Sequence, residues 1–188
     1  MDHYIDLQLR PDPELAANHI VSAVYTRLHL ALAQLHSDDI GVSFPAHDNL
    51  KPTLGDLMRL HGPMNSLVGL FERPWLKGLE DHLHLGTIGL VPPNPAHRVV
   101  DRVQVKSNVE RLRRRAMKRH GLDAATAAER IPESSEERLQ LPFVRLGSRS
   151  TGQTSFPLFI RHGPLRPNPV SGPFSSYGLS RGATIPWF

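Results

Sequence analysis

The fold is decided first by residues 4–35, which read YIDLQLRPDPELAANHIVSAVYTRLHLALAQL. The segment Tyr4–Leu9 has the pattern of a short strand. A helical pattern then opens at Asp12, the expected N-cap, and Pro13, the expected first helical position, and continues to about Leu35. Its apolar stripe recurs at helical spacing. The members of this stripe are Ile20, Val21, Val24, Leu28, Leu32 and Leu35.

Four more segments complete the first half of the chain. Ile40–Phe44 and Leu54–His61 predict a second and a third strand, Met64–Phe71 a shorter helix, and Leu83–Val91 a last strand. Strand–helix–strand–strand–helix–strand is the element order of the ferredoxin-like fold. Because that fold carries many functions, the order alone does not identify the activity.

Length and composition exclude several classes of protein. The chain has 188 residues, 39% of them hydrophobic and 21% charged, which is typical of one globular domain or two small ones. It contains no cysteine, so disulfide scaffolds, iron–sulfur clusters, thiol nucleophiles and Cys-based zinc sites are excluded. It shows neither a signal-peptide pattern nor a run of about 18 apolar residues, so we expect a cytoplasmic protein.

Charge and proline divide the chain. The net charge is only +4, but the basic residues concentrate between Arg98 and Arg119. The segment Val91-Pro92-Pro93-Asn94-Pro95 precedes them and reads as a stiff linker. We therefore expect an α+β protein with a ferredoxin-like domain over residues 1–94. A smaller α/β domain that carries the basic residues would follow over residues 95–188.

A helix over residues 108–120 is expected to carry most of the positive charge. Ser107 and Glu110 form a capping box at its start, and Gly121 ends it. One face is apolar and contains Val109, Leu112 and Ala116. The cations fall within an arc of roughly 140° on the opposite face. They are Arg111, Arg114, Arg115, Lys118 and Arg119.

Like charges at this spacing destabilise a helix unless an anion neutralises them, and a polyphosphate backbone is such an anion. The alternatives are a solvated helix face, which would usually mix signs, and an acidic membrane surface. For the latter, the apolar face is too small to insert.

The residues just before this helix read as a strand. Arg102, Gln104 and Lys106 would point to one side of it, and the intervening valines would point into the core. Arginine pairs with guanine and glutamine with adenine, so this side is suited to reading bases. An ordinary amphipathic strand with solvated polar residues is the alternative.

Together these residues resemble the CRISPR repeat-processing endoribonuclease of type I-F systems. The resemblance covers nearly the whole chain at close to constant spacing. The matching segments are Met1–Tyr4, Arg10–Glu14, Ile40–Pro45, Arg73–Leu76, Val103–His120, Ser150–Gln153, Leu158–Pro164 and Pro186–Phe188.

The resemblance implies metal-independent cleavage of precursor CRISPR RNA at the 3′ base of a repeat hairpin, without a cofactor. It implies that the enzyme stays on its product, the mature guide RNA, as a subunit of the type I-F surveillance complex, and that the basic helix enters the major groove of the hairpin. The expected RNA contacts are Arg102, Gln104, Lys106, Arg111, Arg114, Arg115, Lys118, Arg119, His120 and Phe156.

The resemblance also implies a catalytic set of His29, Ser148 and Tyr177. Cleavage without a metal can use the 2′-hydroxyl of the RNA as nucleophile, and histidine is the natural base for it. His29 would be that base, Ser148 would constrain the hydroxyl, and Tyr177 would orient His29. Phe156 would stack on the terminal base pair. Phe159 is a competing aromatic for this role, although its alternation with Leu158 and Ile160 favours a core strand.

Other interpretations stay open at this point. A surface histidine, a Gly/Ser turn and a core tyrosine would explain the same three positions without catalysis. His82-Leu83-His84 could contribute to metal binding but has no third ligand nearby. Asp38-Asp39 could belong to a carboxylate metal site, but a helix-to-strand turn explains this pair better, so we expect no metal site. The competing functions are a non-cleaving RNA-binding subunit and a basic DNA-binding regulator.

Overall fold

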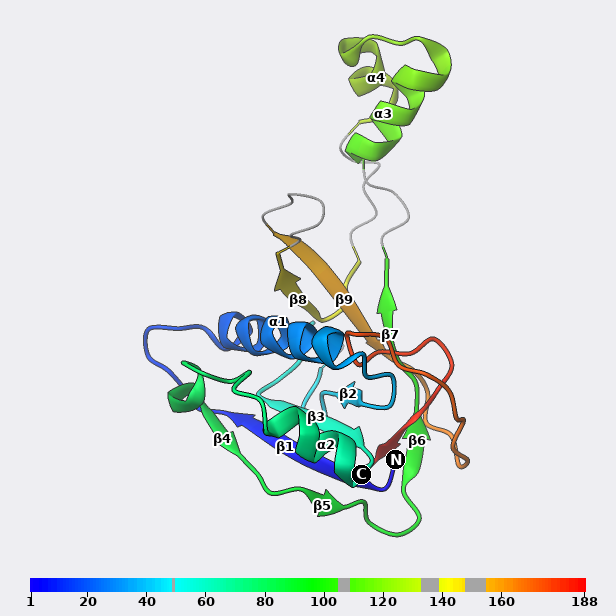
Figure 1. The fold of residues 1–188 in the computed structure, drawn as a ribbon. Helices are drawn as coiled ribbons and strands as arrows, with labels where there is room; N and C mark the ends of the chain where they lie inside the picture. Colours follow the sequence, from blue (N-terminus) through cyan, green and yellow to red (C-terminus); the bar gives the residue numbers. More distant parts are fainter. Residues whose placement is uncertain (49, 105–108, 133–138, 148–154) are drawn as a thin grey trace. The chain divides into compact units, whose positions relative to one another are not determined.

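The computed structural model describes residues 1–48, 50–104, 109–132, 139–147 and 155–188 of an α+β protein (Figure 1). It contains two compact units. The larger comprises Met1–Val103 together with Leu141–Phe188, and the smaller comprises Gln104–Gln140. The boundary expected near residue 94 falls within the larger unit, and a domain division at that point stays a prediction.

The first sheet of the larger unit contains five antiparallel strands: β1 (His3–Leu9), β2 (Gly41–Ser43), β3 (Leu57–Gly62), β4 (Leu83–Leu85) and β5 (Gly89–Leu90). Their order is β2-β3-β1-β4, and β5 also pairs with β1. The last strand, expected over Leu83–Val91, is instead two short strands. Between them the Gly86 N–H donates to the Asp6 carbonyl at 2.8 Å, and pairing resumes at His3 opposite Leu90.

Two helices pack on this sheet, α1 (Ala17–Leu35) and α2 (Met64–Phe71), and a 3₁₀ turn, η1 (Glu80–His82), precedes β4 (Figure 1). Helix α2 has the predicted bounds, and all of the predicted α1 stripe except Leu35 is fully buried. The predicted start of α1 at Asp12 is wrong. The Asp12 carboxylate accepts the Glu14 and Leu15 N–H groups at 2.8 and 2.9 Å, so it closes a separate turn before the helix begins.

The rest of the larger unit adds two small antiparallel sheets. Strand β6 (Ala96–Arg98) pairs with β10 (Ile185–Trp187). Strands β7 (Val100–Val103), β9 (Phe156–His162) and β8 (Phe143–Leu146) form a sheet in that order. The inner face of the β7-β9-β8 sheet packs into the same core as the five-stranded sheet through buried side chains. They include Val100, Val144, Leu146, Leu158 and Ile160.

Two expectations about these strands are wrong. Strand β7 ends at Val103, so Gln104 follows the strand and does not alternate with Arg102 within it; Lys106 lies outside the described residues. Phe159 is half-exposed and not part of the core, because Leu158 and Ile160 occupy the inner face and alternation places Phe159 on the outer one.

The smaller unit contains α3 (Val109–His120) and α4 (Ala124–Arg130). Val109 is buried, as the predicted apolar face requires, and Gly121 ends the helix with a φ of 64°. Asp123 caps α4 by accepting the Thr126 N–H at 2.7 Å. The Arg113 guanidinium donates to the Ile131 carbonyl at 2.9 Å, which ties α3 to the end of α4. The predicted cap Ser107 lies outside the described residues.

A tight turn near the C-terminus requires a glycine. Gly178 has a φ of 67°, and its carbonyl accepts the Val42 N–H at 2.8 Å, which ties the turn to β2. A Cβ placed on Gly178 would lie 2.3 Å from Cγ2 of Val42. The turn is therefore fixed at a position that no L-residue occupies without strain.

This geometry predicts that Gly178→Ala destabilises the protein by about 2–4 kcal/mol, through left-handed strain and overpacking. A Cβ added to Gly69, inside α2, would meet no atom within 4 Å, so Gly69→Ala is the matched control and should stabilise by about 0.5–1 kcal/mol. Urea unfolding measures both values. Equal free energies of unfolding for the two variants would contradict the strained turn.

Candidate functional site

His29 lies on α1 at the edge of the core, and its side chain is half-buried. Its Nδ1 lies 2.9 Å from the carbonyl oxygen of Ser176. A carbonyl only accepts, so Nδ1 must carry the proton and the Nε2 lone pair is left available in the neutral ring. Among the described residues, none forms a hydrogen bond with Nε2. In the neutral ring, this contact therefore leaves Nε2 as the nitrogen that can accept a proton.

The ring of Tyr177 lies against this imidazole. The two rings stack with centroids 4.0 Å apart and an interplanar angle of 9°. The Tyr177 carbonyl accepts the hydroxyl of Tyr25 at 2.7 Å, and Tyr25 lies on α1 one turn before His29. Burial raises the pKa of Tyr25 well above its usual value, so this hydroxyl stays protonated and donates. Helix α1 thus holds the segment Ser176–Tyr177 at two points.

Two residues of the β7-β9-β8 sheet, Arg102 and Phe156, add to this cluster. The Arg102 guanidinium carbon lies 5.6 Å from the centroid of the Tyr177 ring and 5.8 Å from that of Phe156. Arg102 comes from β7, and Phe156 is the first residue of β9. The structure therefore brings together four of the predicted site residues, His29, Tyr177, Arg102 and Phe156, from distant parts of the sequence.

The other predicted residues are distributed differently. Ser148 and Lys106 lie outside the described residues, and only the backbone of Arg111 is described. Gln104 is exposed at the start of the smaller unit. The remaining cations are exposed on α3, as the predicted basic face requires. They are Arg114, Arg115, Lys118, Arg119 and His120.

Two other histidines are unsuited to act as bases. Burial, with a smaller contribution from the nearby Arg59, lowers the pKa of His61 to about 3. Burial, followed by the charges of His47 and Arg98, lowers the pKa of His162 to about 3 as well. Their Nε2 atoms lie 2.9 Å from Ser43 Oγ and 3.2 Å from the Phe44 nitrogen, respectively. Both rings are therefore neutral parts of the core.

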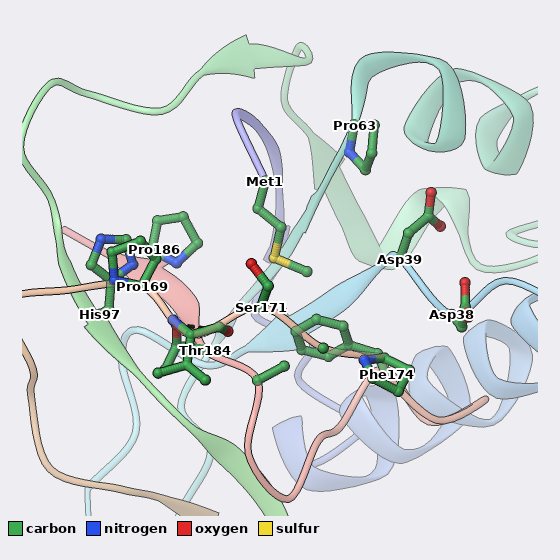
Figure 2. A pocket seen from close by; sticks show the side chains of 14 residues that line it. Met1, Asp38, Asp39, Pro63, His97, Pro169, Ser171, Phe174, Thr184 and Pro186 are labelled. Carbon is green, nitrogen blue, oxygen red and sulfur yellow. Dashed lines mark hydrogen bonds between the residues drawn. The ribbon is translucent and has the colours of Figure 1, made fainter.

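A cavity of about 690 Å³ lies in another part of the larger unit (Figure 2). Asp38 and Asp39 stand at one side of it, and the rest of the lining includes Met1, Phe174, Thr184 and several prolines. The Asp39 carboxylate accepts the hydroxyls of Ser37 and Ser66. None of the four clustered site residues lines this cavity.

The metal candidates of the sequence have other contacts in the structure. His82 lies 3.2 Å from the Asp12 carboxylate, on the turn that precedes α1. Within the part of the chain that the structure describes, no three histidine or carboxylate side chains gather as metal ligands. In the same residues, no helix is long and apolar enough to cross a membrane.

Sequence reasoning missed two groups at the site. The Ser176 carbonyl is a backbone atom, and no residue type signals its role. Tyr25 had a signal, because it lies four positions before His29 on the same helix, but a core tyrosine gives the same pattern. Only the structure shows that its hydroxyl donates to the Tyr177 carbonyl.

Comparisons with known proteins identify the class to which this fold and site belong. A family model described as "CRISPR-associated protein (Cas_Csy4)" matches residues 4–188, so the chain belongs to the Cas_Csy4 family. This confirms the resemblance to the type I-F repeat-processing enzymes. Two similar proteins, from Pseudomonas aeruginosa (strain UCBPP-PA14) and Escherichia coli (strain UTI89 / UPEC), are each named "CRISPR-associated endonuclease Cas6/Csy4". They are 50% and 46% identical to this chain over 188 residues, covering 100% of both sequences in each case.

The buried histidines make stability depend on pH. Because the pKa of His162 is about 3 when folded and 6.5 in an exposed chain, the unfolded state binds the extra proton between these values. Stability is thus complete above about pH 6.5 and falls as the pH drops toward 3. We expect His162→Gln to reduce the slope of unfolding free energy between about pH 6 and 4 by about 1 kcal/mol per pH unit.

Urea unfolding at a series of pH values measures this slope. His19→Gln, at an exposed position of α1, is the matched control and should keep the slope of the parent protein. An identical slope in the His162→Gln protein would show that the ring of His162 takes up its proton in the folded state.

Proposed function

We propose that this chain is an endoribonuclease that cuts CRISPR repeat RNA by attack of a 2′-hydroxyl, with His29 as the general base. The observation that carries the proposal is the 2.9 Å contact between His29 Nδ1 and the Ser176 carbonyl, which leaves Nε2 as the basic atom. Family membership and the endonuclease names of the two relatives support the same activity.

The proposed reaction balances without a metal ion. Nε2 of His29 removes the proton of the 2′-hydroxyl, and the oxygen attacks the adjacent phosphorus. The bond from phosphorus to the 5′-oxygen breaks, and this oxygen takes up a proton from water, so the products are a 2′,3′-cyclic phosphate and a 5′-hydroxyl. The imidazolium that forms keeps its Nδ1–H bond to Ser176, and this charge-assisted bond stabilises it. Ser148 would constrain the attacking hydroxyl.

The arrangement of cations supports a hairpin as substrate. The cations of α3 would neutralise phosphates along the major groove of an A-form stem, where phosphate contacts dominate. Arg102, Gln104 and Lys106 would contact base edges. Phe156, beside Arg102 in the cluster, would stack on the terminal base pair and place the scissile phosphate near His29 at the 3′ base of the stem.

The frame that carries His29 supports a ferredoxin-like assignment for the N-terminal half. The strand order β2-β3-β1-β4, with α1 and α2 packed on the antiparallel sheet, is the arrangement that this fold requires. After cleavage the protein would stay on the mature guide RNA in the cytoplasm as a subunit of a type I-F surveillance complex.

The base is tested by His29→Ala in the presence of EDTA, with the repeat hairpin of the host array as substrate. We expect the parent protein to cut once, at the base of the stem, and the variant to be slower by at least about a hundredfold. Hairpin affinity should be unchanged, because His29 contributes no cation to the stem. The matched control is His19→Ala, at an exposed position of the same helix, and should cut at the parent rate.

Two outcomes would contradict this mechanism. Cleavage that requires Mg²⁺ would mean that a metal and not His29 activates the nucleophile. Tight binding with no cut by the parent protein would favour the non-cleaving RNA-binding subunit.

The basic face of α3 is tested by the salt dependence of hairpin binding. Arg115→Gln and Lys118→Gln should each lower the slope of log K against log [salt] by about 0.7–0.9, because each releases one counterion fewer. Arg10→Gln, exposed at the end of β1, is the matched loss of charge and should leave the slope unchanged. Equal slopes for all of these proteins would place the stem away from α3.

A further inference from the structure

The outer face of the β7-β9-β8 sheet carries aromatic side chains where a water-facing sheet usually carries polar ones. The three strands pair so that their side chains lie side by side on this face: Phe143 on β8, Phe159 on β9 and Val103 on β7. Their neighbours along the strands, Val144, Leu158 and Ile160, point inward and are buried. Phe143 is 36% exposed and Phe159 is half-exposed.

The two phenylalanines form one surface. Their ring centroids lie 5.6 Å apart with an interplanar angle of 58°. The guanidinium carbon of the exposed Arg145 lies 5.7 Å from the centroid of Phe143. Two places along β9 from Phe159, Arg161 pairs with Asp101 at 2.7 Å. Within the described residues no ion pair of Arg145 is found.

This combination suits unpaired nucleobases better than other partners. Single-stranded RNA is bound by aromatic rings on the face of an antiparallel sheet, where bases stack, and by arginine beside them. Within a duplex the bases stack on one another, so only a terminal pair offers a free face to such rings. A cross-strand pair formed only for stability is the competing explanation, and it requires neither the exposure nor the arginine.

The position of this face relates it to the proposed cleavage site. The segment between β8 and β9, residues 147–155, contains Ser148 and connects Leu146 to Phe156. Phe156, on the inner side of the sheet, belongs to the cluster with Arg102. RNA that passes the cluster would do so at the Leu146–Phe156 end of the β8 and β9 strands. It would then meet the outer face of the same two strands.

We propose that the outer face of the β8–β9 hairpin binds unpaired nucleotides next to the repeat stem. Their bases stack on Phe143 and Phe159, and Arg145 contacts their phosphates. The inference rests on the proposed function for the presence of RNA, but it adds a binding surface that the cleavage reaction does not require.

The test is fluorescence-polarisation titration with three RNAs, each carrying a deoxyribose at the cut position. One is the repeat hairpin alone, and the other two add a tail of about ten uridines, either upstream or downstream of the stem. In the parent protein we expect one of these tails to increase affinity by about tenfold. The variant Phe143→Leu/Phe159→Leu, which keeps an apolar face, should lose this gain.

Matched measurements separate this surface from the proposed function. Leu90→Ala removes an exposed apolar side chain from β5 and should retain the full gain. Arg145→Gln should lower the salt slope for the tailed RNA only. If the hairpin alone fails to bind or is not cut in its all-ribose form, the proposed function fails, while the gain from a tail still reports on this face.

Three results would overturn the inference. The first is that neither tail changes the affinity of the parent protein, and the second is that the leucine variant keeps the gain. The third is that the leucine variant loses hairpin affinity and thermal stability together, which would assign the two rings to packing alone.

Discussion

The hydrogen bond from His29 Nδ1 to the Ser176 carbonyl is the constraint on which the chemistry of the site depends. It selects one tautomer of the imidazole and so determines which nitrogen can take a proton. The bond is only as well defined as the segment that carries the carbonyl. That segment is held by the hydroxyl of Tyr25, by the Val42 N–H and by a glycine in a left-handed conformation. The contacts of the C-terminal turn thus hold the Ser176 carbonyl oxygen in place.

The two units of the chain hold different parts of the proposed site. The larger unit holds the cluster of His29, Tyr177, Arg102 and Phe156 at the edge of its core. The smaller one presents the cations of α3, while Arg113 is used internally to tie α3 to α4. Long-range attraction of phosphate needs charge and little precision, whereas the base needs a fixed ring. Full-length relatives at 50% and 46% identity are consistent with this division in one chain.

Much of this could be predicted from the sequence, for physical reasons. Helical periodicity placed α2 and most of α1, and the spacing of cations predicted the basic face of α3. The start of α1 was missed because Asp12 can cap a turn as well as a helix. The orientation of Phe159 was misjudged because an alternating apolar run does not show which of its faces is buried. The Ser176 carbonyl could not be predicted, since backbone atoms leave no trace in residue types.

The most direct test of the central claim is nitrogen-15 NMR of the His29 ring in the RNA-free protein at neutral pH. The His29→Ala protein provides the assignment. We predict that the neutral ring carries its proton at Nδ1 and leaves Nε2 bare. A neutral ring protonated at Nε2 would contradict this claim, because no lone pair would then remain for the 2′-hydroxyl of the RNA.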